Sequence, residues 1–381
     1  MEVTQHYNPV RLLMGANAVG LLGKEVRQYG SKCLLVIQNN NDAMLQLQRR
    51  ITAILSKAEI EFEVFTDIRP NPLIQDIEKG MRMLQNGAFD VIVAVGGGSV
   101  IDTAKVLSIS ADESIDWKQC FQNPFLKPVR QKIPFIAVPT TAGTGSHCTQ
   151  AAVVSDEKNI KHSIYSFDFF ASEALVDYTL TMSLPVSLSA STGFDAFCHL
   201  SESYIMGHLS PIMVTINVEA MKKAITTLPK LVKENKPEYR EIMSVVDSCA
   251  GICLSNGGAI IPHAFGEILS GVAYRINHGH SLAICYPPFV EHYYDHEKYG
   301  QKIKEVIRLF DHGQDEVKDG KAARKIIERF IESLGMPYQL AAFDIRDDEL
   351  EVMRSRMMGV KRFQVEETKE IIDDICKSAK K

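Results

Sequence analysis

The chain has 381 residues, of which 45% are hydrophobic and 23% charged, a composition typical of globular proteins with a sizeable core. Its formal net charge of −5 gives no electrostatic reason to expect a nucleic acid or an anionic membrane as a partner. The sequence lacks a signal-peptide pattern and an apolar run near the ~20 residues of a membrane span, so we expect a cytoplasmic protein with reduced cysteines.

The first half of the chain alternates short apolar segments with amphipathic ones. The apolar segments predict buried strands at 33–37, 62–65, 91–95 and 133–138. Helical periodicity predicts helices at 42–57 and 73–86, and another one after the glycines that follow the third strand. This alternation predicts a mostly parallel sheet with helices on both faces, a Rossmann-like α/β domain.

Beyond about residue 185 the pattern changes to long helices. They are predicted at 186–206, 212–232, 239–255, 297–310, 322–333 and 347–357. The residues interpreted as breaks between helices are Gly207, Gly257, Gly258, Gly271, Gly279, Pro287, Pro288 and Gly335. We therefore expect two domains, an α/β domain over 1–183 and an all-α domain over 184–381.

A glycine-rich turn follows the third predicted strand and opens a helix. Gly96, Gly97 and Gly98 let the backbone approach a phosphate closely, and the helix start offers free N–H groups to an anion. Ser99 can donate a further hydrogen bond. The turn matches neither G-x-G-x-x-G nor the Walker A pattern, but its position favours pyrophosphate binding over a plain connection.

A second loop of this kind follows the fourth predicted strand. It carries the hydroxyls of Thr140, Thr141, Thr144 and Ser146 between glycines. These groups are suited to a nicotinamide, a ribose or a phosphate, although a tight connection with threonine caps has the same composition. Two such loops at one edge of a parallel sheet favour a dinucleotide site, because ligands bind at the carboxyl ends of parallel strands.

A predicted helix carries Asp195 and His199, which are four residues apart and so point from one face. Such a pair is able to hold one metal, although it also occurs as a plain hydrogen bond on a helix. Further imidazoles follow at His263, His278 and His280. One carboxylate with two or three imidazoles suits Zn²⁺ or Fe²⁺ better than Mg²⁺ or Ca²⁺, which prefer oxygen ligands.

Taken together, these motifs resemble the iron-containing (group III) alcohol dehydrogenase family. In chain order the matching segments are Pro70–Pro72 (PNP), Gly96–Lys105 (GGGSxxDxAK), Pro139–Ser146 (PTTxGTGS), Lys161, Gly193–Tyr204 (GxDAxxHxxExY), Asn256–His263 (N-x6-H) and His278–Pro287 (HGxxLAIxxP). The resemblance covers more than half of the chain, and it implies the family's two-domain fold, shared with dehydroquinate synthase.

The resemblance also assigns residues to roles. The implied metal ligands are Asp195, His199, His263 and His278. The residues expected to bind the cofactor are Gly96, Gly97, Gly98, Ser99, Asp102, Thr140, Thr141, Thr144, Ser146, Lys161, Gln38 and Asn71. The first domain is then the dinucleotide-binding domain, and the helical domain holds the metal and the catalytic residues. A homodimer is implied as well.

Several positions depart from the family pattern. Four residues after His263, where the family usually has a histidine near the nicotinamide, this chain has Glu267, which we include among the catalytic candidates. The first strand ends at Gln38 with no carboxylate to repel a 2′-phosphate, so both NAD(H) and NADP(H) are permitted. Arg275 and Arg362 leave room for an anionic or polyhydroxylated aldehyde.

The implied activity is that of a metal-dependent, NAD(P)-linked alcohol dehydrogenase or aldehyde reductase. Hydride would pass between nicotinamide C4 and a small alcohol or aldehyde at Fe²⁺ or Zn²⁺. Two alternatives remain open at this point. One is a dehydroquinate synthase-like lyase on the same scaffold, which the Asp195/His199 pair disfavours. The other is a catalytically inactive cofactor-binding protein, suggested by Glu267 and by His147 at the end of the second loop.

Overall fold

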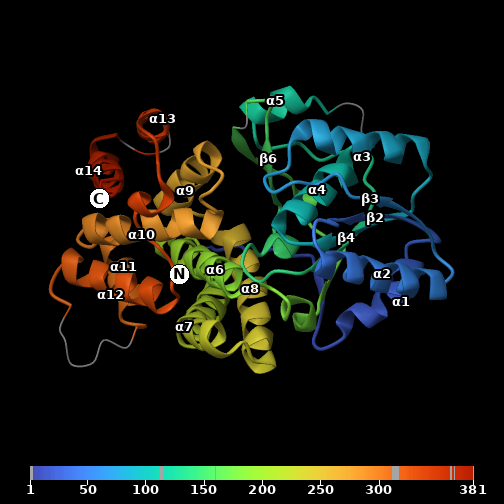
Figure 1. Cartoon of the computed structure of the whole chain (residues 1–381), viewed down its shortest axis with the longest axis horizontal. Coiled ribbons are helices and arrows are strands. Elements are labelled where there is room, and N and C mark those ends of the chain that lie inside the picture. Colours follow the sequence, from blue (N-terminus) through green and yellow to red (C-terminus); the bar gives the residue numbers. More distant parts are fainter. Residues whose placement is uncertain are drawn as a thin grey trace. The chain divides into compact units, whose positions relative to one another are not determined.

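A computed structural model describes residues 3–111, 115–158, 160–310, 317–360, 363 and 365–380 (Figure 1). The chain divides into two compact units. Residues 7–184 form the first, and the described residues after 184, together with 3–6, form the second. The first unit is an α/β structure and the second is helical, as the sequence predicts.

The first unit is built on a six-stranded sheet in the order β1-β8-β5-β4-β2-β3, in which all pairs are parallel. Its strands are β1 (Arg11–Met14), β2 (Lys32–Ile37), β3 (Glu61–Phe65), β4 (Val91–Gly96), β5 (Phe135–Pro139) and β8 (Glu173–Val176). A separate antiparallel hairpin consists of β6 (Ala151–Ser155) and β7 (Lys161–Tyr165). The parallel sheet is thereby confirmed, and the four predicted strands are β2, β3, β4 and β5.

Helices cover both faces of this sheet. They are α1 (Leu22–Arg27), α2 (Asp42–Lys57), α3 (Ile74–Asn86), α4 (Gly98–Ile109) and α5 (Trp117–Gln122). Strand β2 is continuously apolar because both of its faces are buried. Leu34 and Val36 pack into a core with α3 and α4. Cys33 and Leu35 pack into a second core with α1 and α2. Successive strand residues point to opposite faces, so a strand buried on both faces needs apolar residues throughout.

The order of the strands creates a switch point between β2 and β4. The chain leaves β2 towards β3 on one side and then returns to β4 on the other side. The connections leave this point in opposite directions, and in parallel sheets of this kind ligands bind beyond the carboxyl ends of the strands at such a point. Those ends are Gln38 after β2 and the glycine turn after β4, so the fold places two of the predicted cofactor segments there.

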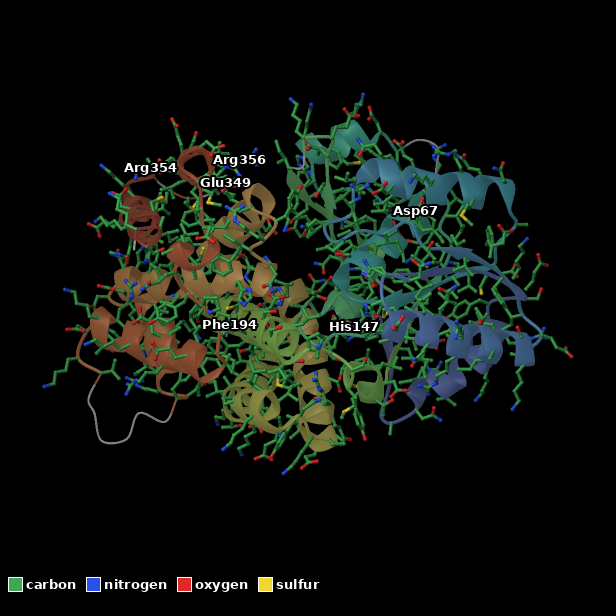
Figure 2. All side chains as sticks on the ribbon, viewed as in Figure 1. Asp67, His147, Phe194, Glu349, Arg354 and Arg356 are labelled. Atoms are coloured by element: carbon green, nitrogen blue, oxygen red, sulfur yellow. The ribbon has the colours of Figure 1, made fainter. Side chains whose placement is uncertain are left out.

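The second unit contains nine helices within the residues that the structure describes. They are α6 (Val186–Met206), α7 (Pro211–Glu234), α8 (Pro237–Gly257), α9 (Ile261–Val272), α10 (His278–Tyr293), α11 (Gly300–Ile307), α12 (Gly320–Ser333), α13 (Asp347–Met358) and α14 (Val365–Lys377). Helix α6 is buried nearly all round and packs on α7, α8 and α10. Its Phe194 belongs to a buried aromatic cluster with Phe197, Tyr286 and Phe330 (Figure 2).

Two helices contradict the predicted breaks. Gly271 lies inside α9, while Gly279, Pro287 and Pro288 lie inside α10, so their interpretation as interruptions is wrong. A proline within a helix removes a backbone donor and costs roughly 3 kcal/mol in an exposed helix. Here both prolines are buried in a helix that packs on α6, α12 and α14, and this packing outweighs local preference.

Within the described residues, no single helix is long and apolar enough to cross a membrane. Helices α8 and α9 reach the required length and apolarity only as a pair, and the pair bends by 109° at its junction.

Candidate functional site

Three imidazoles converge on one carboxylate oxygen in the helical unit. The Nε2 atoms of His199, His263 and His278 lie 3.6, 3.4 and 3.7 Å from Asp195 Oδ1. Asp195 and His199 lie on the same face of α6, one turn apart, as their spacing predicts. The rings of His199 and His263 stack at a centroid distance of 4.4 Å. The sequence thus supplies half of this cluster from one helix.

The other two histidines come from the starts of α9 and α10. His263 is the third residue of α9, and His278 is the first residue of α10. The next residue explains how α10 reaches α6: a Cβ atom at Gly279 would lie 2.0 Å from the backbone oxygen of Ser191. Any side chain there would collide with the α6 backbone. Gly279 therefore permits the close approach that brings His278 to Asp195.

These atoms fit a divalent metal. Among the described residues, Asp195 Oδ1 and His263 Nε2 are buried and have no hydrogen-bond partner. A buried polar atom without a partner costs roughly 1–3 kcal/mol, which a bound cation would remove. Ligand atoms at about 2.0–2.2 Å from a tetrahedral metal lie ~3.3–3.6 Å apart. The ligand atoms of Asp195, His263 and His278 all lie within 4.8 Å of one another, and His199 faces the same carboxylate.

The electrostatics of the cluster also favour a cation. Burial would raise the pKa of Asp195, but the three imidazoles lower this pKa to about 2. Burial would lower the pKa of His263, but the carboxylates of Glu202 and Asp195 raise it to about 10. Two buried carboxylates thus create a strongly negative field at His263. A divalent cation offsets such a field and binds the imidazole in its neutral form.

Glu202 is a functional residue that sequence reasoning missed. Its side chain is fully buried, and its Oε1 lies 2.6 Å from His263 Nδ1. Its Oε2 accepts a hydrogen bond from the backbone N–H of Ile260 at 2.8 Å, at the start of α9. A carboxylate on Nδ1 holds the proton there and leaves Nε2 as the free ligand nitrogen. The available signal was the glutamate of the GxDAxxHxxExY motif, three residues after His199, to which the sequence alone assigned no role.

Two candidates for proton transfer lie on the helices that carry His263 and His278. Glu267 is partly buried and lies one turn after His263 on α9, so both side chains leave the same helix face. His280 is the third residue of α10, and its ring centroid lies 5.5 Å from that of Phe343. Burial lowers the pKa of His280, which favours the neutral imidazole.

Arg275 and Arg362 are the two arginines that the sequence suggests for binding an anionic substrate, and the structure describes the first of them. Arg275 donates to Glu349 Oε1 at 2.9 Å and also bonds Glu349 Oε2. It donates further to the backbone oxygens of Phe343 and Asp344 at 2.6 and 3.0 Å. Its guanidinium is therefore committed to holding α13, which argues against the predicted role in an anion pocket. Arg362 lies outside the described residues.

The glycine turn lies at the junction of β4 and α4. Strand β4 ends at Gly96, Gly97 is the N-cap of α4, and Gly98 begins the helix. Within the described residues, no side chain caps this helix start, so the first N–H groups of Gly98 and Ser99 are available to a ligand. A Cβ atom at Gly96 would lie 2.4 Å from Val100 Cγ2. The geometry thus requires glycine where the backbone turns most tightly.

The second loop lies directly against this turn. The backbone N–H of Thr140 donates to Gly96 O at 3.0 Å. Cβ atoms at Gly97 and Gly98 would lie 3.2 Å from Thr141 Cγ2 and 2.9 Å from Thr144 Cγ2, respectively. The threonine side chains therefore rest on the bare glycine backbone. This pairing forms a narrow cradle that larger side chains in the turn would fill.

The remaining cofactor candidates lie around the same sheet edge. Gln38 Nε2 donates to the backbone oxygen of Ile68 at 3.1 Å, which ties the end of β2 to the loop after β3. In that loop Asn71 adopts a left-handed conformation with φ 55°. The adjacent Pro72 accepts a hydrogen bond from the backbone N–H of Ser155, the β6 residue that pairs with Lys161 of β7. The hairpin thereby brings Lys161 near the Asn71 loop.

Comparison with known proteins gives two family matches that together span nearly the whole chain. Residues 9–178 match the family described as iron-containing alcohol dehydrogenase. Residues 189–379 match the C-terminal family of Fe-containing alcohol dehydrogenases. The first match falls on the α/β unit, and the second falls on the helical unit with the histidine cluster.

Named relatives are 27–29% identical to this chain, and each match covers most of both chains. Long-chain-alcohol dehydrogenase 1 of Geobacillus thermodenitrificans is 28% identical, with 95% of this chain and 92% of the relative covered. NAD-dependent methanol dehydrogenase of Bacillus methanolicus is 27% identical, with 92% of each covered. NADPH-dependent butanol dehydrogenase of Clostridium saccharobutylicum is 29% identical, with 84% and 82% covered.

A solved structure of the same fold is that of an archaeal halo-thermophilic alcohol dehydrogenase from a Red Sea brine pool. The TM-score is 0.88 at 24% identity, and 99% of each chain is covered. At this identity the comparison establishes the fold and its two-unit construction.

Proposed function

Because the chain belongs to the iron-containing alcohol dehydrogenase family, and is accordingly an oxidoreductase, we propose specific roles for its residues. Asp195, His199, His263 and His278 hold a divalent metal, with Fe²⁺ favoured over Zn²⁺. The observation that carries this proposal is the convergence of three Nε2 atoms on Asp195 Oδ1, two of these polar atoms being buried without a hydrogen bond. The relatives named above are dehydrogenases, which favours neither a lyase nor an inactive protein.

At the cluster, a divalent metal supplies a Lewis acid that stabilises negative charge on the substrate oxygen. Asp195 provides the anionic ligand, while the histidines bind as neutral imidazoles. Glu202 keeps the Nδ1 proton of His263 in place, so that Nε2 of this ring faces the cluster. Gly279 holds His278 in reach by letting α10 approach α6.

In the α/β unit, the nicotinamide cofactor supplies the centre that accepts or donates hydride. Gly96, Gly97, Gly98 and Ser99 bind its pyrophosphate with backbone N–H groups at the start of α4. Further contacts come from Thr140, Thr141 and Thr144 in the second loop, from Asn71 and Lys161, and from Gln38. Asp102 and Ser146 complete the group of residues at this cofactor site.

Glu267 is proposed to move the substrate proton. The family usually has a histidine at this position, whereas a carboxylate there accepts the proton released on alcohol oxidation and returns it on aldehyde reduction. His280 is the second candidate for this transfer, because burial keeps its imidazole neutral. The proposal rests on the position of Glu267 one turn after His263 on α9 and of His280 two residues after His278 on α10.

The chain is proposed to accept both coenzymes. The end of β2 presents the neutral Gln38, whose amide is tied to Ile68 O, and no carboxylate stands at 38–40 to repel a 2′-phosphate. Relatives are named both as NAD-dependent and as NADPH-dependent enzymes. The substrates proposed are small alcohols and aldehydes, the class that these relatives' names share.

The test is turnover by metal-stripped protein reloaded with Fe²⁺ or Zn²⁺. Oxidation of NADH and of NADPH is followed with a series of small straight-chain aldehydes. We expect activity only after a metal is restored, with both coenzymes used. Tight coenzyme binding without turnover on any aldehyde would contradict the proposal and would support an inactive binding protein.

A cytoplasmic homodimer is proposed as the working form. All eight cysteines are free thiols, and seven of them are buried, which suits a reducing compartment. Strand β1 lies at the edge of the parallel sheet, where its outer backbone groups are available to a second copy. Light scattering on a size-exclusion column tests the dimer, and a monomer at micromolar concentration would contradict it.

A further inference from the structure

A lysine is buried completely inside the α/β unit. Lys105 on α4 has no exposed side-chain surface, and its Nζ donates three hydrogen bonds. The acceptors are Ser146 Oγ at 2.8 Å, Thr149 Oγ1 at 2.8 Å and Ala151 O at 2.6 Å. An ammonium group has three donors, so each of them is used. All three acceptors belong to one segment, which continues the second cofactor loop into β6.

Asp102, one turn before Lys105 on α4, binds the same segment. Its Oδ1 accepts from Ser146 Oγ at 2.6 Å, and its Oδ2 accepts from the backbone N–H of Val153 at 3.0 Å. Asp102 Oδ1 also lies 3.6 Å from Lys105 Nζ. The Ser146 hydroxyl thus accepts a hydrogen bond from the lysine and donates one to the aspartate. Both carboxylate oxygens and this hydroxyl are occupied within the protein.

Burying the charged side chains of Lys105 and Asp102 costs free energy, so a role in packing alone does not explain them. Burial lowers the pKa of Lys105 to about 8, against the opposing effect of Asp102. An apolar pair of similar volume often stabilises a protein as well as a buried ion pair does. A fully satisfied polar network, in contrast, fixes one arrangement of the segments that it joins. The segment joined here carries Thr141 and Thr144, which rest on Gly97 and Gly98.

We propose that Asp102 and Lys105 are positioning residues that hold the second loop at a fixed distance from the glycine turn and so pre-form the cofactor cradle. This rests on the proposed function of the two loops. The residues act through Ser146, Thr149 and the β6 backbone, not by touching the cofactor. Asp102 and Ser146 are thereby assigned to the support of the site, in place of the direct contact predicted for them.

A pre-formed cradle predicts a particular kinetic signature. Without Lys105 the loop samples other positions, and cofactor binding must order it again, which weakens binding. Once saturating cofactor has ordered the loop, the later steps proceed as before. Lys105→Met is therefore expected to raise the KM for coenzyme and to leave kcat at saturating coenzyme nearly unchanged.

The experiment compares the full-length protein with Lys105→Met by titration with NADH and with NADPH. We expect the dissociation constant to rise about tenfold or more, given the hydrogen bonds lost to a buried charged group. Hydrogen exchange in the cofactor-free protein should become faster at residues 140–153. The matched control is Lys132→Met. Lys132 is half-buried and, like Lys105, donates to a backbone oxygen, that of Phe170, but it lies before the start of β5 and the second loop follows the end of this strand.

Thr149→Val provides a second variant in case Lys105→Met does not fold. It keeps the shape of the side chain and removes one acceptor of Lys105, so a smaller rise of about threefold is expected, with faster exchange at 143–151. Unchanged affinity and unchanged exchange in the folded variants would overturn the inference. If the unmodified protein binds neither coenzyme, the proposed function is overturned instead. The comparison of hydrogen exchange would still test whether Lys105 holds the second loop in place.

Discussion

At the scale of single residues, the proposed metal site is supported by a carboxylate that is not among its proposed ligands. Glu202 accepts the Nδ1 proton of His263 with one oxygen and the backbone N–H of Ile260 with the other. It therefore orients the imidazole and fixes the start of α9 at the same time. A ligand whose ring is held in this way loses less freedom when it binds a metal.

Replacing this carboxylate by an amide should weaken metal binding. Glu202→Gln keeps the size of the side chain but replaces one carboxylate oxygen by an NH2 group. This donor then faces another donor, either the Nδ1–H of His263 or the backbone N–H of Ile260. We expect the metal dissociation constant to rise by about 10–100-fold, as for other supports of metal-binding histidines. Competition with a chromogenic chelator measures this constant.

The control for that variant lies two residues further on the same helix. Tyr204→Phe removes only the hydrogen bond from the Tyr204 hydroxyl to Glu305 Oε2, which is 2.5 Å long. Metal affinity should be unaffected. Equal affinities for the unmodified protein and Glu202→Gln would show that His263 needs no such support.

At the scale of elements, the site depends on the close contact between α6 and α10. Gly279 lies between His278 and His280, and its Cα faces the backbone of Ser191. Helix propensity alone disfavours glycine here, by roughly 1 kcal/mol relative to alanine. The tight contact reverses that preference, because alanine would push α10 away from α6.

Gly279→Ala should therefore destabilise the fold and impair the metal site together. We expect a loss of about 1–3 kcal/mol in the free energy of unfolding of the metal-free protein, the usual effect of overpacking. Urea unfolding measures this loss, and metal affinity should fall in parallel. Gly359→Ala is the control, because a Cβ atom there would meet Arg356 O at an ordinary 3.4 Å. A stable Gly279→Ala protein with normal metal affinity would contradict the role of the contact.

An ion pair attaches helix α13 to the segment between α9 and α10, and its contribution to the stability of the fold depends on pH. Glu349 lies on α13 (Figure 2). The Arg275 guanidinium holds the pKa of Glu349 at about 2, below its ordinary value of 4.5. A lowered carboxyl pKa stabilises the folded state above about pH 4.5, and this contribution disappears as the pH falls towards 2. The stabilising effect of Glu349 should therefore be largest near neutral pH.

Glu349→Gln tests this expectation through the free energy of unfolding. The difference from the unmodified protein should be largest near pH 7 and should shrink steadily below about pH 4.5. The neighbouring Asp348→Asn is the control, because Asp348 pairs with Arg346 in an exposed ion pair that contributes little. A difference that stays constant with pH would contradict the assigned ion pair.

At the scale of the whole molecule, each unit has its own core and its own proposed ligand site. The α/β unit carries the glycine turn and the threonine loop, and the helical unit carries the histidine cluster. A ligand slows hydrogen exchange where it stabilises local structure. We expect metal to slow exchange in α6, α9 and α10, and coenzyme to slow it at 96–101 and 140–149. Protection by metal confined to the α/β unit would contradict this division.

The parts of the molecule that could be predicted from sequence are those set by local pattern. Strand β2 was predictable because burial on both faces requires a continuous apolar run. Asp195 and His199 were predictable as a pair because helical spacing places them on one face. Helices α9 and α10 were not, since their glycines and prolines oppose helix locally. Packing of α9 on α10 and α13, and of α10 on α6, α12 and α14, compensates.

Long-range partners also escaped prediction. The contact of Glu202 with His263 spans 61 residues, and those of Lys105 with its acceptors span 41 to 46. Nothing in the local sequence shows whether a buried charge faces a ligand or another residue. Asp102 illustrates this, because its place in the glycine motif suggests a cofactor contact while its oxygens are used inside the protein.

Asp195 and the histidines around it are proposed to hold a metal on which turnover depends. The most direct test measures the metal content and the aldehyde-reducing activity of anaerobically prepared protein, alongside His263→Ala and His278→Ala. We predict about one metal ion per unmodified chain, with metal and turnover lost together in both variants and kept in the control His296→Ala. Variants that keep both their metal and their turnover would contradict the account.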